Sequence, residues 1–194
     1  MSLTIINNKK HIISLKDLST QETLDIINRG IAYSNNTVEM GHQLKNKVIG
    51  IYFTKTSTRT RTSFSTAGLR LGAQILAYGP NDLQINTGET IEDTMEVLSR
   101  MLDGLVIRTA GDPKVLRAFA NQNRMSIINA MTADEHPTQA LADLTTIKQH
   151  FGELSGLHII YMGEGNNTAT ALAMAIGKFK NMKISFFTPP DYHV

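Results

Sequence analysis

Residues 48–64, VIGIYFTKTSTRTRTSF, place an apolar run directly before a cluster of hydroxyl and guanidinium side chains. The run 48–53 is rich in β-branched and aromatic residues and predicts a buried parallel strand. The following residues, about 58–72, carry Phe64 and other apolar positions without a proline and predict a helix. Ser57 then falls at the helix N-cap, where free N–H groups and the helix dipole favour an anion.

Two arginines, Arg59 and Arg61, lie in the first turn of this predicted helix. A guanidinium can bind a phosphate through two parallel hydrogen bonds, which a lysine cannot do. Because residues two apart on a helix point in different directions, the two side chains cannot face one ligand alike. We predict that Arg59 binds the anion and that Arg61 has a supporting role in the structure of the site. Taken alone, the cluster is equally consistent with a capped helix that carries two solvated arginines.

A second polar motif follows another strand-like run, at 126–130. Pro137 suits the first position of a helix, so His136 and Gln139 should lie together at a helix N-terminus. They offer a ring nitrogen and a carboxamide to a small polar ligand. A single histidine before a proline is more often a cap or a surface residue, but two such motifs in one chain favour a ligand site.

Helices and strands alternate along the chain. After a first helix that begins with a capping box of Ser19 and Glu22, strands are predicted at 48–53, 74–78, 104–109 and 126–130, with helices at about 58–72, 90–102, 113–124 and 137–151. This alternation predicts an α/β fold with a parallel sheet covered on both faces. After a break at 152–156, strand, helix and strand follow at 157–162, 168–180 and 183–187. Two strands and one helix cannot bury both faces of a parallel sheet, so this second unit looks cut short.

The composition fits a cytoplasmic enzyme and argues against several other classes. Of the 194 residues 41% are hydrophobic, which is enough for a sizeable core. The chain has no cysteine, and therefore no disulfide framework, thiolate metal site or cysteine nucleophile. The net charge of +2 is nearly balanced, and the sequence has no basic stripe of the kind that binds nucleic acid. No apolar run approaches the length of a membrane span.

Four motifs together resemble the aspartate/ornithine carbamoyltransferase family in their order and spacing. They are Ser57-Thr58-Arg59-Thr60-Arg61, Ile107-Arg108-Thr109, His136-Pro137-Thr138-Gln139 and Gly163-Glu164-Gly165-Asn166-Asn167. The resemblance covers nearly the whole chain and implies two doubly wound parallel-sheet domains, the second incomplete in this chain. The implied divisions are a carbamoyl phosphate-binding domain at 1–135, an interdomain helix at 136–152 and the start of an acceptor-binding domain at 153–194. We therefore expect a fragment, or a protein that has lost its second half.

The resemblance implies transfer of the carbamoyl group from carbamoyl phosphate to an amine, without a metal or a cofactor. It assigns catalytic roles to Arg59, which would face the phosphate, and to Arg108, which would reach the phosphate or the carbonyl oxygen. It also assigns one to His136, which would donate to the carbamoyl oxygen as negative charge develops there. The implied substrate-binding residues are Ser57, Thr58, Thr60, Gln84, Thr109, Gln139 and Asn167. We interpret Arg100 and Asp143 as structural residues.

Two features resemble the ornithine branch of the family. Gln84 stands where the aspartate branch has a lysine, in a loop that reaches the active site of a neighbouring subunit, which implies a homotrimer with shared sites. Asn167 matches the asparagine that binds the α-carboxylate of the amino-acid acceptor, which implies L-ornithine as acceptor and citrulline as product. Glu164 and residues 54–56 depart from the usual pattern of that branch, which leaves another amine acceptor open.

Two functions of other classes also stay open. A dinucleotide-binding oxidoreductase would use the glycine turn at 163–165, but Thr168 replaces the third glycine of its fingerprint. A non-catalytic homologue would keep the anion site without turnover.

Overall fold

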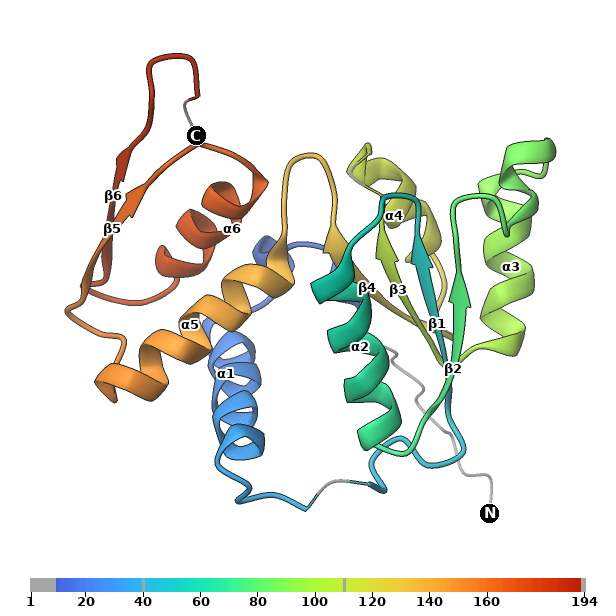
Figure 1. Ribbon diagram of the computed structural model, residues 1–194, viewed down its shortest axis with the longest axis horizontal. Helices are drawn as coiled ribbons and strands as arrows, with labels where there is room; N and C mark the ends of the chain where they lie inside the picture. Colours follow the sequence, from blue (N-terminus) through green and yellow to red (C-terminus); the bar gives the residue numbers. More distant parts are fainter. Residues whose placement is uncertain (1–9, 40, 110, 193–194) are drawn as a thin grey trace. The chain divides into compact units, whose positions relative to one another are not determined.

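The computed structural model describes residues 10–39, 41–109 and 111–192. Cα packing divides the chain into two units (Figure 1). The first unit holds the described residues up to Ile13 together with 41–128, and the second holds 14–39 together with 129–192. Residues 14–39 thus belong with the C-terminal part of the chain. The domain boundaries expected at 135 and 152 stay a prediction.

The first unit is built on a four-stranded sheet in the order β2-β1-β3-β4. Its strands are β1 (Val48–Phe53), β2 (Gln74–Tyr78), β3 (Gly104–Arg108) and β4 (Ser126–Met131), the last of which runs on into the second unit. β1 pairs in parallel with both β2 and β3, and Phe53 lies opposite Arg108. The carboxyl ends of β1 and β3 therefore meet at one edge of the sheet. The predicted α/β class with a parallel sheet is confirmed.

Helices cover both faces of this sheet. One face packs with α3 (Ile91–Met101) and α4 (Pro113–Phe119) in a core that includes Tyr52, Leu98, Leu105, Ile107, Leu116 and Phe119. The helix α2 (Thr58–Arg70) packs on β1 and β2, where Gly68 approaches Ile75 closely. Ile75 pairs with Ile49, three residues before Tyr52, so α2 lies on the opposite face.

The helix α4 is shorter than predicted, because it ends at Phe119 rather than near residue 124. The cause is the side chain of Gln122, whose Oε1 accepts from the backbone N–H groups of Arg124 and Met125, both at 2.7 Å. Its Nε2 donates to the Met125 carbonyl at 2.6 Å. The carboxamide thereby replaces helical hydrogen bonds and turns the chain into β4.

A tight turn follows α2 at Gly72, whose φ of +91° is rarely adopted by residues with a side chain. An added Cβ at this position would overlap the backbone oxygen of Gly41. The turn therefore requires glycine for two separate reasons.

The second unit contains the short η1 (Leu15–Asp17), three helices and a two-stranded parallel sheet. The helices are α1 (Thr20–Ser34), α5 (Pro137–Phe151) and α6 (Asn167–Ile176), and the strands are β5 (His158–Met162) and β6 (Lys183–Phe187). Both α1 and α6 pack against α5. The capping box of Ser19 and Glu22 is confirmed, whereas α6 ends four residues before the predicted Lys180, at a turn in which Gly177 donates to Ala173.

One face of the β5–β6 sheet has little cover from the described residues. The side chains of Ile160, Met162 and Phe187 are 59%, 79% and 62% exposed. Within the described ranges, none of the helices combines the length and the apolarity that crossing a membrane requires.

Candidate functional site

The N-terminus of α2 has the capped geometry that the sequence predicts. Ser57 is extended, with φ −159° and ψ 114°, and its Oγ accepts from the Thr60 N–H at 3.3 Å. The N–H groups of the first helical residues, Thr58 and Arg59, have no acceptor within the helix by its geometry. This end of α2 can therefore donate to an anion, with the helix dipole adding to the attraction.

The loop that leads into α2 is fixed to the end of β3. The Thr54 N–H donates to the Arg108 carbonyl at 3.0 Å, and Thr54 Oγ1 donates to the Thr109 carbonyl at 3.0 Å. The Thr109 hydroxyl itself accepts from the Gly111 N–H at 3.1 Å. The structure thus brings the predicted residues Ser57, Thr60, Arg108 and Thr109 to one edge of the sheet, where parallel α/β proteins bind ligands.

Arg108 is a partly buried cation that lacks a carboxylate partner among the described residues. Its Nη1 lies 3.5 Å from Thr60 Oγ1, at the outer limit of a hydrogen bond, and its buried Nε has no partner there either. Burial lowers the pKa of this guanidinium from its ordinary value, but an arginine stays charged at neutral pH. Buried donors are normally satisfied, so an anion at this position would supply what Arg108 lacks.

Arg59 and Arg61 are both exposed on the first turn of α2. Neither side chain makes a hydrogen bond or an ion pair with any residue that the structure describes. Gln84 is also exposed, in η2 (Gln84–Thr87), where its Oε1 accepts from the Thr87 hydroxyl. The predicted roles of Arg59 and Gln84 in ligand binding, and of Arg61 in support, stay predictions.

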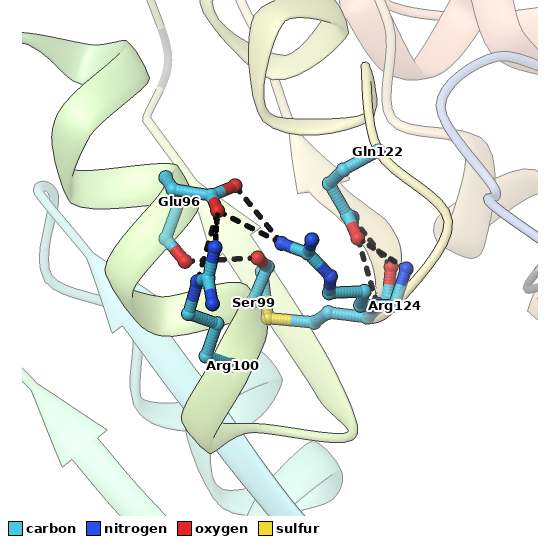
Figure 2. Close-up of polar contacts among 6 residues, drawn as sticks. Glu96, Ser99, Arg100, Gln122 and Arg124 are labelled. Carbon is cyan, nitrogen blue, oxygen red and sulfur yellow. Dashed lines mark hydrogen bonds and ion pairs between the residues drawn. The ribbon is translucent and has the colours of Figure 1, made fainter.

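Arg100 has the structural contacts expected of it. Glu96 on α3 accepts from Arg100 one turn later and from Arg124 Nη1 at 2.9 Å, beyond the end of α4 (Figure 2). The two guanidiniums lower the pKa of the Glu96 carboxyl. The contact with Arg124 therefore joins α3 to the segment that leads into β4, whereas Arg100 pairs with Glu96 within α3 itself.

His136 lies in the second unit at the N-cap of α5, which begins at Pro137 as predicted. Its side chain is 7% exposed and makes no cap hydrogen bond to the helix. The backbone N–H of His136 donates to the Asn167 carbonyl at 3.2 Å, and its Nδ1 lies 3.4 Å from Thr138 Oγ1. The ring thus lies at the start of α5, beside the Thr138 hydroxyl.

Asn167 connects the turn after β5 to the segment before α5. Its Nδ2 donates to the Thr132 carbonyl at 2.7 Å, while its own carbonyl accepts from His136. The neighbouring Asn166 caps α6 by accepting from the Thr168 N–H at 3.0 Å. Two residues that the sequence singled out separately, His136 and Asn167, are therefore in direct backbone contact.

Gln139 is exposed on α5, and its Nε2 donates to Asp143 Oδ1 at 3.0 Å. Burial raises the pKa of the Asp143 carboxyl, and the hydrogen bond from Gln139 opposes that shift. The sequence interpretation placed Asp143 in packing or capping and missed this contact. The spacing of four residues on one helix is a signal that could have revealed it.

Glu135, next to His136, is a further residue that the sequence interpretation missed. It is 4% exposed, and its Oε1 accepts from the backbone N–H of Leu15 at 2.7 Å. Its carbonyl accepts from the Thr132 N–H at 2.9 Å. Because Leu15 is far away along the chain, no local pattern could have indicated this contact.

Each unit thus presents a distinct chemistry. The first offers helical N–H groups and an unpaired guanidinium, which suit an oxyanion, and the second offers an imidazole and a carboxamide at the start of α5. Among residues 10–39, 41–109 and 111–192, no group of three His, Cys, Asp or Glu side chains could hold a metal ion.

Known proteins share this fold and much of this sequence. Ornithine carbamoyltransferases from Caldicellulosiruptor saccharolyticus and Synechococcus elongatus are 41% and 40% identical, over 95% and 94% of this chain and 60% and 58% of their own length. The structure of ornithine carbamoyltransferase from Pyrococcus furiosus matches with a TM-score of 0.87 at 34% identity, over 95% of this chain and 59% of that one. The chain spans about 60% of the length of these relatives.

The family match covers both groups of polar residues, those at the start of α2 and the end of β3 and those at the start of α5. Residues 10–149 correspond to the aspartate/ornithine carbamoyltransferase, carbamoyl-P binding domain. That stretch runs from the first described residues through the capped α2, the end of β3 and nearly all of α5. By this match, and by its identity to the relatives above, the chain belongs to the aspartate/ornithine carbamoyltransferase family.

Proposed function

We propose that this chain binds carbamoyl phosphate and takes part in the transfer of its carbamoyl group to an amine. The observation that carries the proposal is Arg108, a guanidinium with a buried and unsatisfied Nε beside the capped start of α2. Both lie in the stretch that matches the carbamoyl-P binding domain. Arg108 and Arg59 would bind the phosphate together with Ser57, Thr58 and Thr60, through side chains and helical N–H groups.

His136 and Gln139 would act on the carbamoyl group. In the reaction the amine nitrogen bonds to the carbonyl carbon, which becomes tetrahedral, while the carbonyl oxygen becomes an oxyanion. The bond from that carbon to the phosphate oxygen then breaks. The nitrogen loses a proton, and the products are a carbamoylated amine and inorganic phosphate. An N–H of His136 aimed at the oxyanion would stabilise it more than the neutral carbonyl, which is the requirement for catalysis. Gln139 would recognise the carbamoyl NH₂.

L-Ornithine is the acceptor that we propose, with citrulline as the product. The relatives that match this chain over most of its length are named ornithine carbamoyltransferases. A side-chain amide has two N–H donors, and Asn167 uses one of them on Thr132, which leaves the second for an α-carboxylate. Thr109 would complete the binding set at the end of β3.

A homotrimer with shared sites is the assembly that we propose, with Gln84 reaching the site of a neighbouring subunit. The exposure of Gln84 and its place in the short η2, outside the sheet, are compatible with that role. Sedimentation of the purified chain tests the assembly, and a strictly monomeric chain that binds carbamoyl phosphate would contradict it.

Calorimetry with carbamoyl phosphate and with NAD tests the substrate. We expect carbamoyl phosphate to bind and NAD not to bind; the reverse result would favour the oxidoreductase. Arg59→Ala should weaken carbamoyl phosphate binding by about 10- to 150-fold, the equivalent of about 1.5–3 kcal/mol for hydrogen bonds to a charged group. The matched variant Arg61→Ala should change it by less than about threefold, because Arg61 is predicted to have a supporting role without contacting the anion and is exposed.

Phosphate release with a panel of amines tests the acceptor. We expect ornithine to stimulate release and to yield citrulline. Stimulation by a different amine would replace ornithine as the acceptor, and tight binding without amine-dependent release from any of them would favour a non-catalytic homologue.

A further inference from the structure

Asp143 lies one helical turn after Gln139 on α5, where residues four apart face the same side. The contact joins Gln139 Nε2 to Asp143 Oδ1 at 3.0 Å. Gln139 is exposed and Asp143 is half-buried.

The chemistry of this pair fixes which way the carboxamide points. An ionised carboxylate only accepts hydrogen bonds, whereas a carboxamide has a donating NH₂ end and an accepting oxygen end. Asp143 can therefore hold Gln139 only by its NH₂ end. The Oε1 atom is left pointing away from Asp143 as a hydrogen-bond acceptor.

An acceptor at this position distinguishes between acyl phosphates that have the same shape. Carbamoyl phosphate ends in an NH₂ group, which donates, and acetyl phosphate ends in a methyl group, which does not. When Gln139 presents Oε1, carbamoyl phosphate gains a hydrogen bond to it. Acetyl phosphate instead leaves Oε1 facing a methyl group without a donor.

We propose that Asp143 is a positioning residue that makes the site specific for an acyl phosphate with a donating NH₂ group, by fixing the orientation of the Gln139 carboxamide. The proposal rests on the proposed function, because it assumes that Gln139 faces the carbamoyl group. It adds the reason for the selectivity and names the residue that controls it.

The test compares two variants that remove the same charge from the same kind of pair. Asp143→Asn replaces the carboxylate by an amide that can present either a donor or an acceptor to Gln139, so both orientations become possible. Asp25→Asn is the matched control, because Gln21 Nε2 donates to Asp25 Oδ1 at 2.8 Å with the same spacing on α1. Calorimetry gives the ratio of the Kd for acetyl phosphate to the Kd for carbamoyl phosphate.

For the unmodified chain we expect a ratio of about 2 to 12, which corresponds to one neutral hydrogen bond. Asp143→Asn should bring the ratio towards one, mainly by weakening carbamoyl phosphate, and Asp25→Asn should leave it unchanged. The side-chain ¹⁵N–¹H signals of Gln139, assigned from their loss in Gln139→Met, should shift in Asp143→Asn and not in Asp25→Asn. This second readout needs no ligand.

An unchanged ratio in Asp143→Asn, unmoved Gln139 signals, or an equal effect of Asp25→Asn would each overturn the role of Asp143. If the unmodified chain fails to bind carbamoyl phosphate, the proposed function has failed and the specificity proposal falls with it. If carbamoyl phosphate binds and the ratio of the two Kd values is unchanged in Asp143→Asn, only the role of Asp143 has failed. The two failures are therefore distinguishable.

Discussion

Replacing Arg108 by methionine should separate the function of this side chain from its contribution to folding. The buried Nε of Arg108 has no partner among the described residues, and Nη1 reaches Thr60 Oγ1 only at 3.5 Å. An unsatisfied buried donor costs about 1–3 kcal/mol. Methionine matches the arginine side chain only as far as Nε and carries no polar hydrogen, so Arg108→Met removes the unsatisfied buried donor. We expect the free energy of unfolding without ligand to stay level or to rise by about 1 kcal/mol.

The same substitution should strongly reduce the affinity for carbamoyl phosphate. Hydrogen bonds to a charged group contribute about 1.5–3 kcal/mol, which corresponds to a Kd weaker by about 10- to 150-fold. Urea unfolding followed by circular dichroism gives the first quantity, and calorimetry gives the second. The affinity should fall while the free energy of unfolding does not, which is the mark of a side chain retained for ligand binding.

Arg100→Met is the matched control for this experiment. Arg100 bonds to the exposed carboxylate of Glu96, so its loss should lower stability slightly and leave the affinity for carbamoyl phosphate unchanged. A large loss of stability in Arg108→Met together with unchanged affinity would refute the reasoning, because Arg108 would then be a structural residue.

Three further outcomes are expected. Glu135→Ala should lower the free energy of unfolding by about 1–3 kcal/mol, because the buried N–H of Leu15 loses its acceptor; Glu135→Gln keeps an acceptor, and an equal loss in both variants under urea would count against this explanation. Gly72→Ala should lower the free energy of unfolding by about 1–3 kcal/mol more than strain at φ +91° alone would, because the added Cβ overlaps the Gly41 oxygen. Gly88→Ala, at φ +107° in open space, supplies that reference, and equal thermal shifts in the two variants would show that the clash is relieved. The pKa of Asp143 is raised in the folded chain above its ordinary value of 3.8. Between these two pKa values the folded chain keeps the proton and the unfolded chain releases it. The contribution of Asp143 therefore favours unfolding increasingly as the pH rises through this interval. Urea titrations from pH 4 to 7 should therefore show Asp143→Asn gaining stability relative to the unmodified chain, and parallel curves would contradict the shift.

Much of the fold follows from local sequence patterns. The predicted strands at 48–53, 74–78 and 183–187 agree with the structure to the residue, and Ser57 caps its helix as expected. These features depend on periodicity and on caps that bond within four residues, so a short window of sequence contains them. The early end of α4 was missed because Gln122 folds back onto its own loop, and a glutamine within a helical pattern gives no sign of doing so.

The sequence by itself therefore determined the alternating fold, the capped start of α2 and the family, since each rests on neighbouring residues or on motifs in a fixed order. The state of Arg108 was decided only in the tertiary structure, because the absence of a carboxylate partner depends on which distant segments surround the end of β3. The contact of Glu135 with Leu15 joins positions 120 residues apart, beyond the reach of any local pattern. Long-range packing sets which polar groups are buried and which of them remain unpaired, and a short window of sequence does not contain that information.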